Sequence, residues 1–159
     1  MKTLLVFGLL LAMTTFAQAQ ETRKLTYEQA SALFGALQSL DGHQRVVKDG
    51  QQERIVQEPY DIAPGLRLVI AQDMLKAKAA VGTLQVAFAA VQKQFVGADG
   101  KVPDDKLVAF NVEVRKLQQE MSDEQFTPIR YEELKPSTNN FPPSVLAGLM
   151  PVLVIDEKK

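Results

Sequence analysis

A long amphipathic pattern between Leu66 and Phe95 constrains this chain most, because it predicts one helix on which the remaining segments have to pack. Eight apolar residues recur in it at alternating spacings of four and three, as they do along one face of an α-helix. They are Ile70, Met74, Ala77, Val81, Leu84, Phe88, Val91 and Phe95. At about 1.5 Å per residue, the helix would be roughly 45 Å long.

The residues beside this stripe carry little charge. From Ala79 to Gln92 the sequence has no charged side chain, whereas two-stranded coiled coils usually carry charges beside their seam. The uncharged stretch is also shorter than the roughly 17–25 residues of a membrane span. We therefore interpret the stripe residues other than Ala77 in two ways. They are core positions of a helix buried on more than one side, or interface positions for another protein or a second copy.

A second helix is predicted after the turn at Gly97–Lys101. Residues 103–105 are a proline and two aspartates, which suit a helix N-terminus because proline is tolerated there and carboxylates face the positive end of the helix dipole. The three-four spacing then recurs at Leu107, Phe110, Val114, Leu117 and Met121. Two helices with matching stripes and a short loop predict an antiparallel, coiled-coil-like hairpin.

Shorter elements precede the long helix. Thr26 and Gln29 form a capping box that begins a helix, and Asp41-Gly42 ends it. Asp49-Gly50 lies between two strand-like segments, 45–48 and 53–56, and predicts a β-hairpin with at most one buried face. In the connector between Pro59 and Pro64, we expect Tyr60 and Ile62 to pack against the core.

The C-terminal part is mixed in character. Residues 125–131 are predicted to be extended, interrupted by Pro128, and available to extend the β-hairpin. Pro142-Pro143 opens a short helix that Pro151 ends, and the apolar residues 152–155 should dock on the core. The predicted fold class is α+β and mainly α. It consists of a long antiparallel helix hairpin, short flanking helices and a small β-hairpin near 45–56.

The first nineteen residues have the features of a secretory signal peptide. Lys2 precedes an apolar run from Leu4 to Phe16, and Ala17 and Ala19 are the small residues that a signal peptidase recognises. We expect cleavage after Ala19, export to the periplasm or the medium, and a single mature domain over 20–159. The alternative is an uncleaved anchor, for which the apolar run is short.

Composition excludes several function classes. The chain has no cysteine, so it has no disulfide, thiolate zinc site, thiol nucleophile or lipidated cysteine, and its core alone must stabilise it. Without Lys2, the only charge of the leader, 17 basic and 19 acidic residues remain. This balance does not favour a nucleic-acid partner, which requires a clustered basic surface.

No catalytic, cofactor-binding or metal-binding residue is predicted. His43 is the only histidine and is interpreted as a solvated turn residue. The turn Asp99-Gly100-Lys101 lacks the oxygen ligands of a calcium loop. The alternative is a small hydrolase that uses His43 with Asp41 or Glu58. We regard the chain as non-enzymatic, without a metal or a cofactor.

Two resemblances accompany this reading. The order of Leu40-Asp41-Gly42, the helical segments 65–71 and 110–117, and Pro142-Pro143-Ser144-Val145-Leu146 resembles a family of small phage-encoded helical proteins of unknown function. That resemblance implies no known reaction. The segments Leu25-Thr26-x-x-Gln29 and Met121-Ser122-x-x-Gln125 resemble the L-T-x-x-Q motifs of periplasmic stress chaperones similar to Spy. That resemblance implies a helical surface that holds unfolded proteins.

The sequence thus predicts an exported helical protein that acts by binding a protein partner or itself and that is related to phage proteins. The alternatives are the Spy-like chaperone and the small hydrolase.

Overall fold

The computed structural model describes residues 21–40, 42–50, 52–97 and 100–156. The predicted leader, with Ala17 and Ala19, lies outside the described residues, and so does Asp41. Within the described ranges, helices predominate, and the predicted α+β, mainly α class is confirmed.

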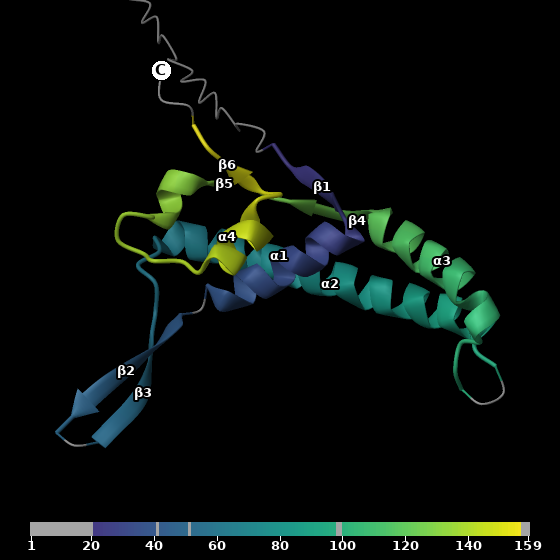
Figure 1. Ribbon diagram of the computed structural model, residues 1–159. Coiled ribbons are helices and arrows are strands. Elements are labelled where there is room, and N and C mark those ends of the chain that lie inside the picture. The colour runs from purple at the N-terminus through teal and green to yellow at the C-terminus, as the bar shows by residue number, and fades with distance from the viewer. Residues whose placement is uncertain (1–20, 41, 51, 98–99, 157–159) are drawn as a thin grey trace, which may run out of the picture.

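The core is built around α1 (Tyr27–Ser39), which packs on the first half of α2 (Pro64–Phe95) and carries α4 (Pro143–Leu149) on another side (Figure 1). We call this part of the molecule the head. The predicted capping box starts α1: the Gln29 amide donates to Thr26 Oγ1 over 3.2 Å, and the Thr26 amide donates to Gln29 Oε1 over 3.0 Å. Apolar side chains of α1 and α4 form the centre of the core, namely Leu33, Leu37, Val145 and Leu149.

Two small sheets bring both ends of the described chain to the head. In the first, β1 (Arg23–Thr26) pairs antiparallel with β4 (Met121–Phe126). In the second, β5 (Ile129–Arg130) pairs parallel with β6 (Leu153–Val154), so the apolar C-terminal segment docks as predicted. The Arg23 guanidinium donates to the carbonyls of Pro151 and Leu153 over 3.1 and 3.3 Å.

These two sheets correct two predictions. Met121 does not continue the second long helix, because α3 (Leu107–Gln119), preceded by a short 3₁₀ helix at Asp104–Lys106, ends before it and β4 begins there. Residues 125–131 do not extend the predicted β-hairpin, because Gln125 and Phe126 pair with β1, and Ile129 and Arg130 pair with β6. The buried face of β4 consists of Ser122 and Phe126, and a serine there does not mark an apolar strand face in the sequence.

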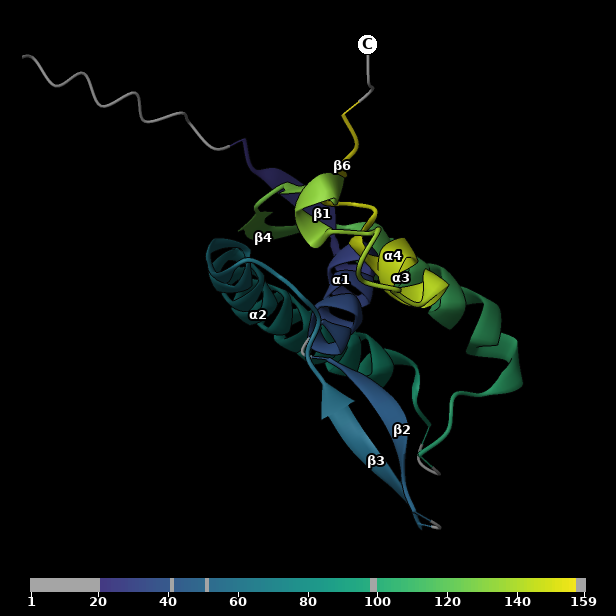
Figure 2. The ribbon, with the colours of Figure 1, turned by 90° about the vertical axis from the view of Figure 1, so that its left-hand side faces the viewer.

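The predicted β-hairpin is confirmed as β2 (His43–Asp49) and β3 (Gln52–Glu58). It projects from the head as a separate arm, which is visible in both views (Figures 1 and 2). Every side chain of β3 is exposed. The hairpin therefore has less buried surface than the single covered face that the sequence permits.

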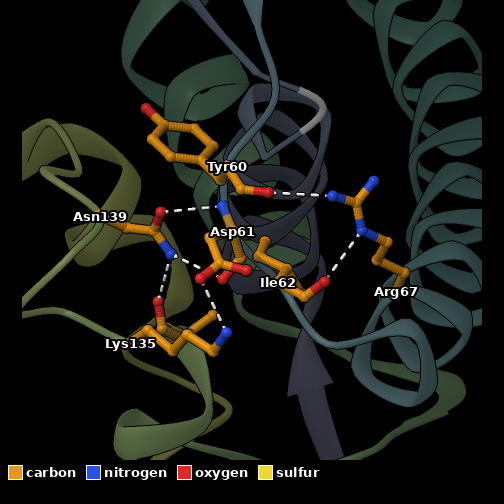
Figure 3. A network of polar contacts seen from close by, with 7 residues as sticks. Tyr60, Asp61, Ile62, Arg67, Lys135 and Asn139 are labelled. Atoms are coloured by element: carbon orange, nitrogen blue, oxygen red, sulfur yellow. Dashed lines mark hydrogen bonds and ion pairs between the residues drawn. The ribbon is translucent and has the colours of Figure 1, made fainter.

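A polar network fixes the connector before α2 (Figure 3). The buried Asn139 amide accepts from the Asp61 backbone amide over 2.9 Å and donates to the Asp61 and Leu134 carbonyls over 3.1 and 2.7 Å. Arg67 donates to the carbonyls of Tyr60 and Ile62 over 2.9 and 3.0 Å. The side chains of Tyr60 and Ile62 are buried, as predicted for this connector. The start of α2 is thus held to the segment before α4.

A second polar contact ties the first half of α2 to the end of β4. Asp73 is 1% exposed, and its carboxylate accepts from the Thr127 amide and from Lys76 Nζ, each over 2.8 Å. A buried carboxylate requires such partners. Together with the connector, this contact fixes the proximal half of α2 in the head and sets the direction in which the rest of the helix leaves it.

Candidate functional site

The predicted stripe of α2 divides into two parts. Ile70 and Ala77 are buried in the head, and Met74 packs against the core. Beyond Ala80, α2 leaves the head and packs side by side with α3, which runs back toward it (Figure 1). We call residues 81–95 and 107–114 the distal hairpin.

Aromatic contacts hold the distal hairpin together. The Phe110 ring of α3 lies edge-to-face against two rings of α2, with centroid distances of 6.1 Å to Phe88 and 5.7 Å to Phe95. Such pairs contribute roughly 0.5–1.5 kcal/mol beyond the burial of their area. Matching stripes on the two helices therefore meet as the sequence predicts, and the helix hairpin is confirmed.

The distal hairpin leaves much apolar surface in water. Among the stripe residues, Val81, Leu84, Val91 and Phe95 are half-buried. Phe88 is 38% exposed, although it contacts Phe110, and Val86 on another side of α2 is 73% exposed. Three more exposed apolar residues lie on α3: Leu107, Val108 and Val112. In the described structure, α3 is the element that packs along this half of α2, so the faces that the two helices share are the covered ones.

One groove is lined by residues of α3 alone. It has a volume of about 430 Å³ and is lined by Val108, Asn111, Val112, Arg115, Lys116 and Gln119. Its lining therefore combines the two exposed valines of α3 with polar and basic side chains. The combination resembles the apolar centre and polar rim of a protein-binding surface.

Among the described residues, α2 is the one helix that is long and apolar enough to cross a membrane. Its most apolar stretch of eighteen residues has a mean hydropathy of 1.3 and is 11% buried. The proximal half of α2 nevertheless carries Arg67, Asp73 and Lys76, which are engaged in the polar contacts of the head. On α2, the longest stretch without a charged side chain runs from Ala79 to Gln92.

The described residues contain no group of three or more metal-ligating side chains. Glu132 and Glu133 line an open groove of about 410 Å³ beside the start of α2, with Lys135 also at its edge. Of the residues of the alternative hydrolase, Asp41 and the side chain of His43 lie outside the described part. The backbone of His43 pairs with that of Glu58 at the end of β3.

The two L-T-x-x-Q-like segments lie next to each other, although only the first one caps a helix. Thr26, at the end of β1, pairs with Met121 at the start of β4. The second segment forms a strand instead of a helix start. Comparisons with protein families, with curated proteins and with solved structures found no match to this chain.

Proposed function

We propose that this chain is an exported, non-enzymatic protein that binds another protein through the distal hairpin. The observation that carries the proposal is that the apolar stripe of α2 continues beyond the head with no element but α3 packed along it in the described structure. A two-helix arm with exposed valines and a phenylalanine gains stability when further helices cover it, because apolar burial contributes about 25 cal/mol per Å². Export is supported by the leader sequence.

A protein partner fits this surface better than a lipid bilayer. The uncharged stretch from Ala79 to Gln92 would be roughly 21 Å long as a helix, shorter than the roughly 30 Å hydrocarbon core of a membrane. The proximal half of α2 is also fixed in the head through Asp73 and Thr127. Glutamines within the stretch suit the polar contacts of a protein interface better than hydrocarbon.

The experiment compares two substitutions on the same helix. Phe88→Glu places a charge in the distal hairpin, whereas Leu68→Glu places one at a 62% exposed leucine in the proximal half. A photo-crosslinking residue at Gln85 reports contacts of the distal hairpin in the exported chain. We expect a discrete crosslinked product that Phe88→Glu abolishes and Leu68→Glu leaves in place.

Folding and other binding modes are controlled separately. Far-UV circular dichroism of Phe88→Glu identifies a variant that fails to fold, in which case Val86→Glu, at a 73% exposed position, replaces it. A crosslinked product equally strong in wild type and in both distal variants would contradict the proposal. So would crosslinking to lipid vesicles alone. Binding to many unfolded proteins in place of one partner would favour the chaperone alternative.

A further inference from the structure

In the described structure, β2 and β3 form a sheet of two strands only. Its two strands contact each other over a regular register from His43 opposite Glu58 to Asp49 opposite Gln52, and neither strand packs extensively on another described element. An isolated two-stranded hairpin is at best marginally stable in water, whereas a third strand or a packed face stabilises it. Each strand also has a free edge of backbone hydrogen-bonding groups, which is a template for a further strand.

The β3 edge is suited to pairing with its own copy. A two-fold axis at Ile55 places Ile55 opposite the partner's Ile55 and brings all seven residues of β3 into the pairing. In this register Glu53 lies opposite Gln57, and Arg54 lies opposite Val56, so no directly opposed pair joins two like charges. The result would be a four-stranded antiparallel sheet with an apolar row of two isoleucines flanked by the Val46 residues that face them in each copy.

Neighbouring registers are less favourable. An axis at Arg54 would oppose two arginines. An axis at Val56 would bring Pro59 into the pairing, where a proline cannot donate a backbone hydrogen bond. The sequence of β3 therefore favours one self-pairing register. The choice of β3 over β2 rests on exposure, since Ile55 is 68% exposed and every other β3 side chain is also exposed.

We propose that the β2–β3 arm is a dimerisation element that pairs β3 with β3 of a second copy about a two-fold axis at Ile55. This contact is separate from the distal hairpin, so it stands or falls independently of the proposed function. A seven-residue strand is roughly 23 Å long, and an edge contact of that length is smaller than a standard interface. We therefore expect a dimer that forms and dissociates with concentration.

The absence of cysteine from the sequence permits a direct test in the full chain. In antiparallel pairs, opposite Cα atoms lie about 4.5–5.5 Å apart, within the range of a disulfide. Ile55→Cys should give a disulfide-linked dimer on mild oxidation. The matched control is Val46→Cys, on the same face and similarly exposed, whose copies would be separated by three strand spacings, roughly 14 Å.

A mixture of two single variants tests the register. Glu53→Cys and Gln57→Cys should each form no disulfide-linked dimer alone and should form a mixed disulfide when combined, because only the combination places two cysteines opposite each other. In sedimentation velocity, Ile55→Lys should weaken dimerisation about tenfold, which corresponds to about 1.4 kcal/mol, and Val46→Lys should weaken it less. Crosslinking of Val46→Cys but not Ile55→Cys would overturn the proposal by placing the contact at β2. A wild type that remains monomeric at all concentrations would also overturn it.

Discussion

Gly148 marks the tightest contact between α1 and α4 and gives a quantitative test of the head. A Cβ atom at this position would lie 2.7 Å from Ala36 Cβ and 2.8 Å from the carbonyl oxygen of Ala32. Ordinary contacts begin at 3.4 Å. Neither the Ala32 backbone oxygen nor the Ala36 Cβ can rotate away, so Gly148→Ala should push α4 away from α1 by roughly 0.6–0.7 Å, the difference between 3.4 Å and these two distances.

The magnitude follows from two opposing effects. Forced overpacking costs about 1–3 kcal/mol. We expect the upper part of that range, because the added Cβ would clash with a backbone atom in a core that contains fully buried leucines. Alanine in place of glycine returns about 0.5–1 kcal/mol of helix propensity. Gly148→Ala should therefore lower the free energy of unfolding by about 2 kcal/mol. For a chain of this size, that loss corresponds to a decrease in Tm of about 4–8 °C.

Urea denaturation followed by circular dichroism measures the change. The matched control is Gly35→Ala in α1, where an added Cβ meets nothing within 4 Å. This variant should be more stable than wild type by about 0.5–1 kcal/mol, because it gains helix propensity without a clash. A Gly148→Ala variant as stable as wild type would refute the close α1–α4 packing on which the head depends.

Two further predictions concern the connector. Asn139→Ala should lower the free energy of unfolding by about 2–4 kcal/mol in urea denaturation, because it removes three hydrogen bonds and takes this partner from the buried Leu134 carbonyl and from two part-buried backbone groups of Asp61. Asn140→Ala, at the exposed neighbouring position, should change it by less than about 0.5 kcal/mol, and equal effects would contradict this assignment. Burial raises the pKa of the Tyr60 phenol, so the folded chain retains this proton to a higher pH than the unfolded chain. The contribution of this phenol to the free energy of unfolding should therefore be constant below a pH of about 10, and it should decrease as the pH rises above that value. The fall should be smaller in Tyr60→Phe, as measured by thermal unfolding between pH 8 and 11.

Local chemistry made much of the fold predictable. The Thr26 and Gln29 side chains cap α1 through atoms three residues apart, and Asp49-Gly50 permits a tight turn whatever surrounds it. The long helix follows from the periodicity of its own residues and ends at Phe95 as predicted. Each of these features depends on interactions between near neighbours in sequence.

Long-range pairing was not predictable in the same way. The terminal sheet joins Arg23 to Phe126, about a hundred residues apart in the chain, and the buried face of β4 includes Ser122, which has no apolar signature. Asp73 is similar, because a carboxylate in the middle of an apolar helix usually indicates a solvated position. It is buried here because the Thr127 amide reaches it from another element.

The candidate site shows most clearly which features follow from the sequence and which depend on tertiary contacts. The sequence by itself determined the helix, its stripe from Ile70 to Phe95 and the uncharged stretch from Ala79 to Gln92, because periodicity and charge are properties of the chain. Only the tertiary structure decided that Ala77 is fully buried while Phe88, on the same stripe, remains partly exposed. The physical reason is that burial depends on whether another element reaches a face. The head covers the proximal half of α2, whereas α3 covers one side of the distal half.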